Sequence, residues 1–216
     1  MNSKRMLAIA NYINKSDAVI DVGCDHGYLG IILTENNLCR DLLLTDVKQS
    51  ALNNAKRNIE THDVNIKTML TDGLENINLS DYNTVTISGM GTSTILKILV
   101  LLKNDDNITK IIIQSNNNLD ELRVGMQKIG YYLADETTLF ENNIWYVIMK
   151  FKIGYKALKH SEVLFGLLKK DKKGYYEYLL HNYQKINKLI PKRRIMLSLN
   201  IKYKLLILNK LLKECR

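Results

Sequence analysis

The sequence predicts an α/β fold, in which helices cover both faces of a mostly parallel sheet, followed by a C-terminal helical arm. Up to Ile153, apolar segments of strand length alternate with amphipathic segments of helix length, a pattern typical of parallel sheets. After Ile153, apolar residues recur at spacings of three, four or seven, which is typical of helices packed against each other. We therefore expect two domains, 1–154 and 155–216.

The sheet domain begins with an amphipathic helix over 6–13, which either covers the functional site or caps the sheet. The expected strands cover 19–22, 42–45, 66–70, 84–87 and 108–113, and the expected helices cover 28–35, 50–61, 92–102 and 120–129. Two last strands, 131–138 and 144–153, have only a turn-rich stretch between them. This closing hairpin adds an antiparallel strand, which is the layout of Rossmann-like methyltransferases.

The arm is expected to be two long helices that form an antiparallel hairpin or coiled coil. One apolar stripe runs from Leu164 through Leu168 and Leu179 to Leu189, with a break at Gly174, and a second runs from Ile201 to Leu212. Pro191 lies between the stripes, where it can start a helix but not sit inside one.

The most informative motif is a glycine turn at the end of the first strand. Gly23 lets the backbone approach a ligand closely, and the helix that follows offers free N–H groups. The next strand ends on Asp46, whose carboxylate can accept both hydroxyls of a ribose. The glycines do not have the G-x-G-x-x-G spacing, and Asp21 and Asp25 would repel a pyrophosphate. We therefore expect S-adenosylmethionine, a phosphate-free cation, in preference to NAD; the alternative is an ordinary turn with a capping aspartate.

Ligand-type residues also follow the other strands, whose carboxyl ends meet at one edge of such a sheet. Asp72 and Gly73 follow the third strand and are expected to bind the adenine ring of the cofactor. Ser88, Gly89 and Met90 follow the fourth strand and are expected to border the transferred methyl group. The predicted cofactor-binding residues are Asp21, Gly23, Asp46, Asp72, Gly73, Ser88, Gly89 and Met90.

Four motifs resemble those of the bacterial tRNA adenine-22 N1-methyltransferases. They are Asp21-Val22-Gly23-Cys24-Asp25-His26-Gly27-Tyr28-Leu29, Thr71-Asp72-Gly73-Leu74, Ile87-Ser88-Gly89-Met90-Gly91 and Ile113-Gln114-Ser115-Asn116. The family also has a basic helical C-terminal arm. Cys24, Thr92 and Ser115 depart from its pattern without removing a chemical group that the reaction needs.

The resemblance implies methyl transfer to N1 of an adenine in tRNA. The N1 lone pair needs no strong base, but the methylated ring becomes positive or must lose an N6 proton, and a nearby carboxylate would stabilise that charge. Asp25 is the first catalytic candidate, followed by His26 and by Tyr28, which would stack on the flipped base or form a hydrogen bond with it. The alternative is that Asp25 only caps the following helix.

Charge is distributed unevenly along the chain. Residues 152–216 carry 17 Lys and Arg against 4 Asp and Glu, a net charge of +13, whereas residues 1–151 have a net charge of −4. Such a segment attracts a polyanion, although a solvated helical face is the alternative. The predicted RNA-binding residues are Lys169, Lys170, Lys172, Lys173, Lys192, Arg193 and Arg194.

Composition favours a cytoplasmic protein, and the resemblance implies tRNA as its partner. No apolar run is long enough to span a membrane, the N-terminus lacks a signal-peptide pattern, and three cysteines and four histidines show no metal-ligand spacing. We therefore expect no membrane or metal partner; the oligomeric state is not determined, with a monomer favoured. Two other function classes stay open: a small-molecule methyltransferase with a basic tail, and a non-catalytic RNA-binding protein that retains the fold.

Overall fold

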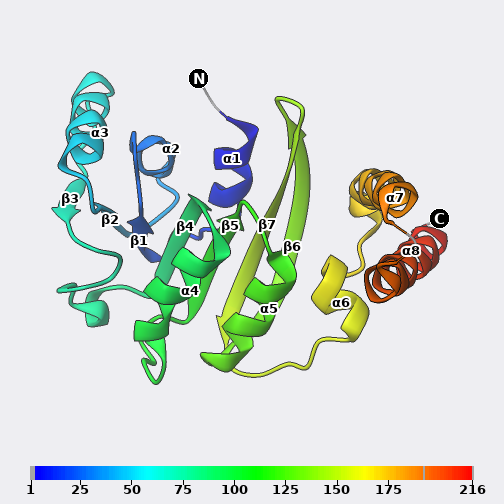
Figure 1. Ribbon diagram of the computed structural model, residues 1–216. Helices are drawn as coiled ribbons and strands as arrows, with labels where there is room; N and C mark the ends of the chain where they lie inside the picture. The colour runs from blue at the N-terminus through cyan, green and yellow to red at the C-terminus, as the bar shows by residue number, and fades with distance from the viewer. Residues whose placement is uncertain (1–2, 192, 216) are drawn as a thin grey trace.

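The computed structural model describes residues 3–191 and 193–215, except for the side chain of Lys170. Seven strands form one sheet in the order β3-β2-β1-β4-β5-β7-β6 (Figure 1). Its strands are β1 (Ala18–Val22), β2 (Asp41–Asp46), β3 (Lys67–Leu70), β4 (Thr84–Met90), β5 (Lys110–Ser115), β6 (Tyr131–Glu141) and β7 (Ile144–Ile153). Of the seven strands, β7 alone runs opposite to the others, so the predicted Rossmann-like methyltransferase sheet with its closing hairpin is confirmed.

Helices cover both faces of the sheet (Figure 1). One core contains apolar side chains of α4 and α5, and the other contains those of α1, α2 and α3. These helices are α1 (Lys4–Ala10), α2 (Tyr28–Glu35), α3 (Gln49–Thr61), α4 (Thr92–Leu99) and α5 (Leu119–Lys128). The helix predicted over 92–102 changes at Val100 into a 3₁₀ turn, Val100–Leu102.

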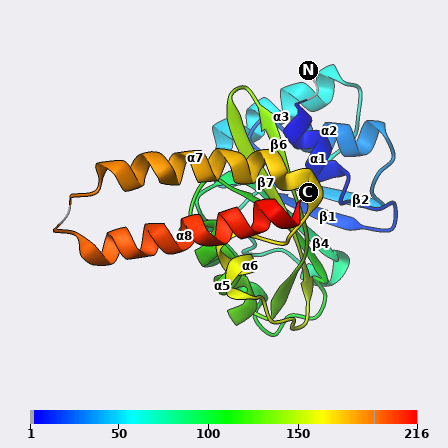
Figure 2. The same cartoon turned by 90° about the vertical axis from the view of Figure 1, so that its right-hand side faces the viewer.

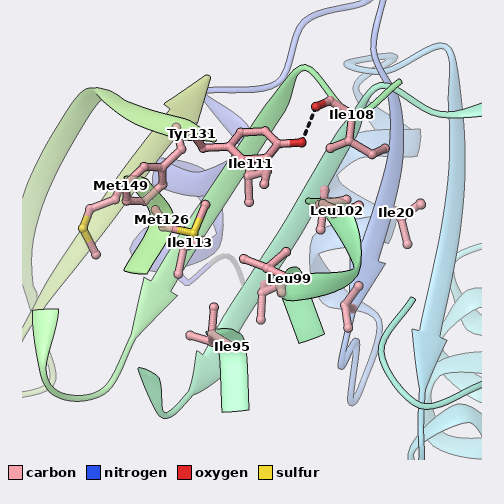
Figure 3. Close-up of a cluster of buried hydrophobic side chains, with 14 of the residues drawn as sticks. Ile20, Ile95, Leu99, Leu102, Ile108, Ile111, Ile113, Met126, Tyr131 and Met149 are labelled. Atoms are coloured by element: carbon pink, nitrogen blue, oxygen red, sulfur yellow. Dashed lines mark hydrogen bonds between the residues drawn. The ribbon is translucent and has the colours of Figure 1, made fainter. Parts of the chain in front are cut away.

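The sheet core is apolar and almost fully closed to solvent. Every residue of β5 is buried, as expected for a central strand that is covered on both faces. Figure 3 shows Leu99, Ile111 and Met126 together in this core, where the Tyr131 hydroxyl donates to the Ile108 carbonyl at 2.6 Å. That bond satisfies the one polar atom of a buried aromatic side chain.

The β6–β7 hairpin is longer than predicted and projects beyond the sheet edge. β6 continues to Glu141 because a two-residue turn, Asn142-Asn143, joins it to β7, and both asparagines have positive φ. Asparagine tolerates this backbone better than most residues, and such turns match the twist of a hairpin. Gln114, the residue before the last of β5, pairs with Ile148, so residues 144–146 of β7 extend past the carboxyl end of β5.

The C-terminal arm consists of α7 (Lys173–Leu189) and α8 (Ile195–Glu214), which lie side by side and antiparallel (Figure 2). The helical hairpin is confirmed, whereas a coiled-coil geometry and the exact domain boundary stay predictions. Within residues 3–191 and 193–215, no helix is both long and apolar enough to cross a membrane.

The predicted first arm helix is wrong in its early part. Leu164 belongs to a separate short helix, α6 (His160–Phe165), and Leu168 lies in an irregular segment. Gly166 ends α6 with a φ of 79°, a conformation that favours glycine. Gly174 is not a break, because it lies in the first turn of α7.

Candidate active site

A cavity of about 1020 Å³ lies at the carboxyl ends of the parallel strands. Side chains from β1, β2, β4 and β5 line it, together with residues of α1 and β7. All of the predicted catalytic and cofactor-binding residues line this one cavity: Asp21, Gly23, Asp25, His26, Tyr28, Asp46, Asp72, Gly73, Ser88, Gly89 and Met90. The structure therefore brings together residues from four strand ends, and their individual roles stay predictions.

Asp46, the last residue of β2, is held by two backbone groups. Its Oδ2 accepts from the Asp25 N–H at 3.3 Å, and its Oδ1 accepts from the Lys48 N–H at 2.9 Å. Asp25 makes this contact from a left-handed backbone conformation, with φ of 49°. The turn after β1 thus fixes the Asp46 carboxylate at the cavity wall, where each oxygen retains capacity to accept a ligand hydroxyl.

The glycine turn after β1 is bonded to the neighbouring strand. The N–H groups of Gly23 and Cys24 both donate to the Thr45 carbonyl, at 2.8 and 2.9 Å. Gly23 has a φ of 73°, and a Cβ at this position would lie 2.1 Å from Cε of Met90. The backbone conformation therefore favours glycine, and the end of the Met90 side chain would have to move to admit a Cβ.

Asp21 lies beneath the turn and is almost completely buried. Burial raises the pKa of its carboxyl to about 6, the Thr86 hydroxyl lowers it by donating to Oδ1 at 2.6 Å, and the charge of Asp46 raises it. At neutral pH, Asp21 and Asp46 together place negative charge at this wall, which favours a cationic ligand.

Asp72 and Gly73 form the side of the cavity beyond β3. Asp72 is exposed, whereas Gly73 is buried with a φ of 62°, and a Cβ there would lie 2.9 Å from Cγ2 of Ile98. The Thr71 N–H donates to the Asp46 carbonyl at 3.1 Å, which ties this turn to β2. A carboxylate and a glycine backbone thus lie beside each other at this side of the cavity.

Asp25, His26 and Tyr28 lie exposed around the cavity mouth. The rings of His26 and Tyr28 are stacked with centroids 5.7 Å apart, and His26 Nε2 lies 3.7 Å from Asp25 Oδ2. The alternative that Asp25 caps α2 is wrong, because the N-cap is Gly27 and no side chain makes a capping hydrogen bond there.

The opposite wall combines the strand-end residues Gln114 and Asn116 with Arg5 and Tyr146, two residues that the sequence analysis missed. Gln114 Oε1 accepts from the Gly89 N–H and from Arg5 Nη1, both at 3.2 Å, and Asn116 Nδ2 donates to the Gly89 carbonyl at 2.7 Å. Arg5 lies over the ring of Tyr146, 5.2 Å from its centroid. Gln114 and Asn116 could be recognised in the sequence because they lie at the end of a predicted strand. Arg5 and Tyr146 reach the cavity only because α1 packs against the β6–β7 hairpin.

Lys172 is a correction to the predicted RNA-binding set. Its ammonium is fully buried, forms an ion pair with Glu136, and donates to the carbonyls of Phe165 and Leu167 at 2.9 and 3.0 Å. Glu136 also binds the buried Arg123. Lys172 therefore holds the base of the arm to β6 and cannot reach an RNA phosphate.

The other predicted RNA contacts differ in accessibility. Lys173, Arg193 and Arg194 are exposed, while Lys169 is half-buried and pairs with Asp135. Lys192 and the side chain of Lys170 lie outside the described residues. Across the part of the chain that the structure covers, His, Cys, Asp and Glu form no group of three that could hold a metal.

Comparisons with known proteins agree on the family. Residues 2–149 match the family described as "Methyltransferase domain". The chain is 31% identical over 157 residues to a "tRNA (adenine(22)-N(1))-methyltransferase" of Bacillus subtilis, an alignment that spans 70% of this chain and 65% of that protein.

Solved structures extend the likeness to the whole chain. A structure of M. capricolum TrmK in complex with S-adenosyl-homocysteine is 32% identical, covers 100% of both chains and has a TM-score of 0.85. A putative tRNA (m1A22) methyltransferase of Streptococcus pneumoniae is 27% identical, covers 98% of this chain and 100% of its own, and has a TM-score of 0.89. The chain belongs to the methyltransferase domain family and, within it, to the tRNA (adenine(22)-N(1))-methyltransferases.

Proposed function

We propose that this protein uses S-adenosylmethionine to methylate N1 of adenine 22 in tRNA. The observation that carries the proposal is the cavity in which the Asp46 carboxylate, the Gly23 turn and Asp72 converge, beside an arm of high positive charge. The Bacillus subtilis relative carries this activity in its name. Since tRNA is the proposed substrate, we expect the protein to work in the cytoplasm.

The chain's own residues fit this cofactor. Asp46 would accept the two ribose hydroxyls, and Asp72 with the Gly73 backbone would bind the adenine edge. The Gly23 turn would lie against the methionine part, and Ser88 and Gly89 would border the methyl group. Bound S-adenosylmethionine supplies an electrophilic methyl group on a positively charged sulfur.

The acceptor side needs positioning more than base catalysis. Adenine N1 carries a lone pair, so the residues at the mouth act chiefly by orienting the base toward the cavity. Tyr28 would stack on the flipped base, and Asp25 would stabilise the positive charge that the ring gains, or accept the N6 proton. His26, stacked on Tyr28 and close to Asp25, would orient both side chains.

The arm would supply contacts to the tRNA backbone. Lys173 at its base and Arg193 and Arg194 at its far end are exposed, and a row of cations over this length orients RNA without reading its sequence. Lys169 would contribute only by exchanging its partner Asp135 for a phosphate.

Nucleoside mass spectrometry tests the proposal. Unmodified tRNA and the same tRNA with guanine at position 22 are incubated with the protein and labelled S-adenosylmethionine. We expect 1-methyladenosine in the first tRNA only. Label in small metabolites but not in tRNA would favour a small-molecule methyltransferase, and tRNA binding without label would favour a non-catalytic RNA-binding protein; either result overturns the proposal.

A further inference from the structure

A chain of aromatic rings connects the β6–β7 hairpin to the base of the arm. Phe140 on β6 faces Trp145 on β7, with ring centroids 5.3 Å apart. Trp145 in turn lies 5.6 Å from Tyr175 and 6.3 Å from Tyr178, both on α7. A Cβ on Gly174 would lie 3.3 Å from the indole, so the ring packs closely against the first turn of α7. We call Phe140, Trp145, Tyr175 and Tyr178 the aromatic platform.

Docking of the arm does not by itself explain the platform. Tyr175 is largely covered and packs against the sheet core, as a docking residue should. Phe140 and Tyr178, however, are 50% and 45% exposed, and Ile144 beside them is 52% exposed. Rings that only joined two elements would bury these faces, since each exposed aromatic face forgoes apolar burial.

The platform lies between the cavity and the positive arm. Trp145 packs against α7 and also lines the active-site cavity, together with its neighbours Ile144 and Tyr146. Figure 2 shows the start of α7 beside β6 and β7. Lys173, the first residue of α7, is exposed, and Lys169 precedes it. A ligand that covers the platform therefore meets aromatic faces and positive charge together, next to the place where the methyl acceptor must enter.

We propose that Phe140, Trp145 and Tyr178 bind a nucleobase of the RNA strand next to the target adenine by stacking. The inference rests on the proposed tRNA activity. An adenine whose N1 reaches the cavity has left its stack, so its neighbour in the strand loses a stacking partner. Aromatic side chains replace that partner regardless of base identity, while lysines hold the adjoining phosphates. The platform would thus stabilise the flipped state.

Fluorescence reads this site directly, because Trp145 is the only tryptophan of the chain. We expect tRNA to quench the emission of Trp145 in a saturable titration, and a tRNA with abasic nucleotides on both sides of position 22 to quench much less at equal occupancy. Unquenched emission at full occupancy, or equal quenching by both tRNAs, would overturn the proposal.

Steady-state kinetics provide a second, independent readout. Phe140→Ala and Tyr178→Ala each remove an exposed ring, and we expect each to raise the KM for tRNA roughly five- to thirty-fold. The affinity for S-adenosyl-homocysteine should stay within about twofold, because the cofactor wall is untouched. Tyr155→Ala is the matched control, since Tyr155 is 80% exposed and follows the opposite end of β7.

The outcomes separate the platform from the proposed activity. An unchanged KM in both ring variants, with a wild type that methylates tRNA, would overturn the platform and leave the activity standing. Differential quenching by the two tRNAs without methyl transfer would support the platform and overturn the activity. Trp145→Ala should raise the KM for tRNA, whereas Trp145→Phe, which keeps an aromatic face, should keep the KM close to that of the wild type. An equal rise in both variants would contradict stacking.

Discussion

The methyl group of Met90 occupies the space that a β-carbon on Gly23 would need. Gly23 directly follows β1, Met90 is the last residue of the adjacent parallel strand β4, and the distance from that ideal Cβ to Cε of Met90 is 2.1 Å. The terminal methyl group of Met90 packs against the backbone of Gly23. Two residues that are distant in sequence therefore form the cavity wall at this point.

Gly23→Ala should therefore weaken binding of S-adenosyl-homocysteine by at least tenfold, measured by calorimetry. The added methyl displaces Met90 into the cavity, and the left-handed φ of 73° strains any side chain. The double variant Gly23→Ala/Met90→Ala relieves the clash but not the strain, and should recover part of the affinity. Wild-type affinity in the single variant would show that the turn does not contact the cofactor.

The buried carboxyl of Asp21 predicts a pH dependence of stability. Because the pKa of Asp21 is raised from 3.8 to about 6 in the folded protein, protonation of this carboxyl stabilises the folded state. This stabilisation is fully present below the unfolded pKa of 3.8 and is lost as the pH rises through 6. Relative to Asp21→Asn, the wild type should lose roughly 2.5 kcal/mol of unfolding free energy between pH 4 and pH 7.

Urea unfolding of both proteins across that pH range measures this difference, and the subtraction cancels the other acidic groups. The Asn side chain can still accept from Thr86, so the variant retains that contact. A stability difference that stays constant from pH 4 to pH 7 would contradict the raised pKa.

Two adjacent lysines should behave in opposite ways. Lys172→Met removes the buried partner of Glu136 and should lower the unfolding free energy by about 3 kcal/mol. Lys173→Met alters an exposed residue, so stability should stay within about 0.5 kcal/mol while tRNA affinity falls and its salt dependence becomes shallower. Thermal melts and filter binding at several salt concentrations measure both; a stable Lys172→Met protein with reduced tRNA affinity would reverse the assignment.

Asp25→Asn tests the chemistry at the mouth. Asparagine tolerates the φ of 49°, and the backbone N–H to Asp46 is kept, so affinity for S-adenosyl-homocysteine should stay within several-fold. If the carboxylate stabilises the methylated ring, kcat should fall roughly a hundredfold. Single-turnover methyl transfer to tRNA measures this step, and an unchanged rate would remove Asp25 from the chemistry.

Local signals predicted the sheet domain well, and long-range contacts account for the errors. The helix predicted over 28–35 has the observed bounds, because a glycine turn and an apolar run define it within a few residues. Lys172 looked like its exposed neighbours, since its partner Glu136 lies 36 residues earlier in the chain. Arg5 was missed for the same reason. Its contacts are Gln114 and Tyr146, which lie more than a hundred residues later in the chain.

The central claim is that Asp46 and the glycine turn hold S-adenosylmethionine and not a dinucleotide. Calorimetric titration of the purified protein with S-adenosyl-homocysteine and, separately, with NAD tests it, using Asp46→Ala as the matched variant. The account predicts saturable binding of S-adenosyl-homocysteine, a loss of roughly ten- to a hundredfold in Asp46→Ala, and no binding of NAD. Binding of NAD with no uptake of S-adenosyl-homocysteine would contradict it.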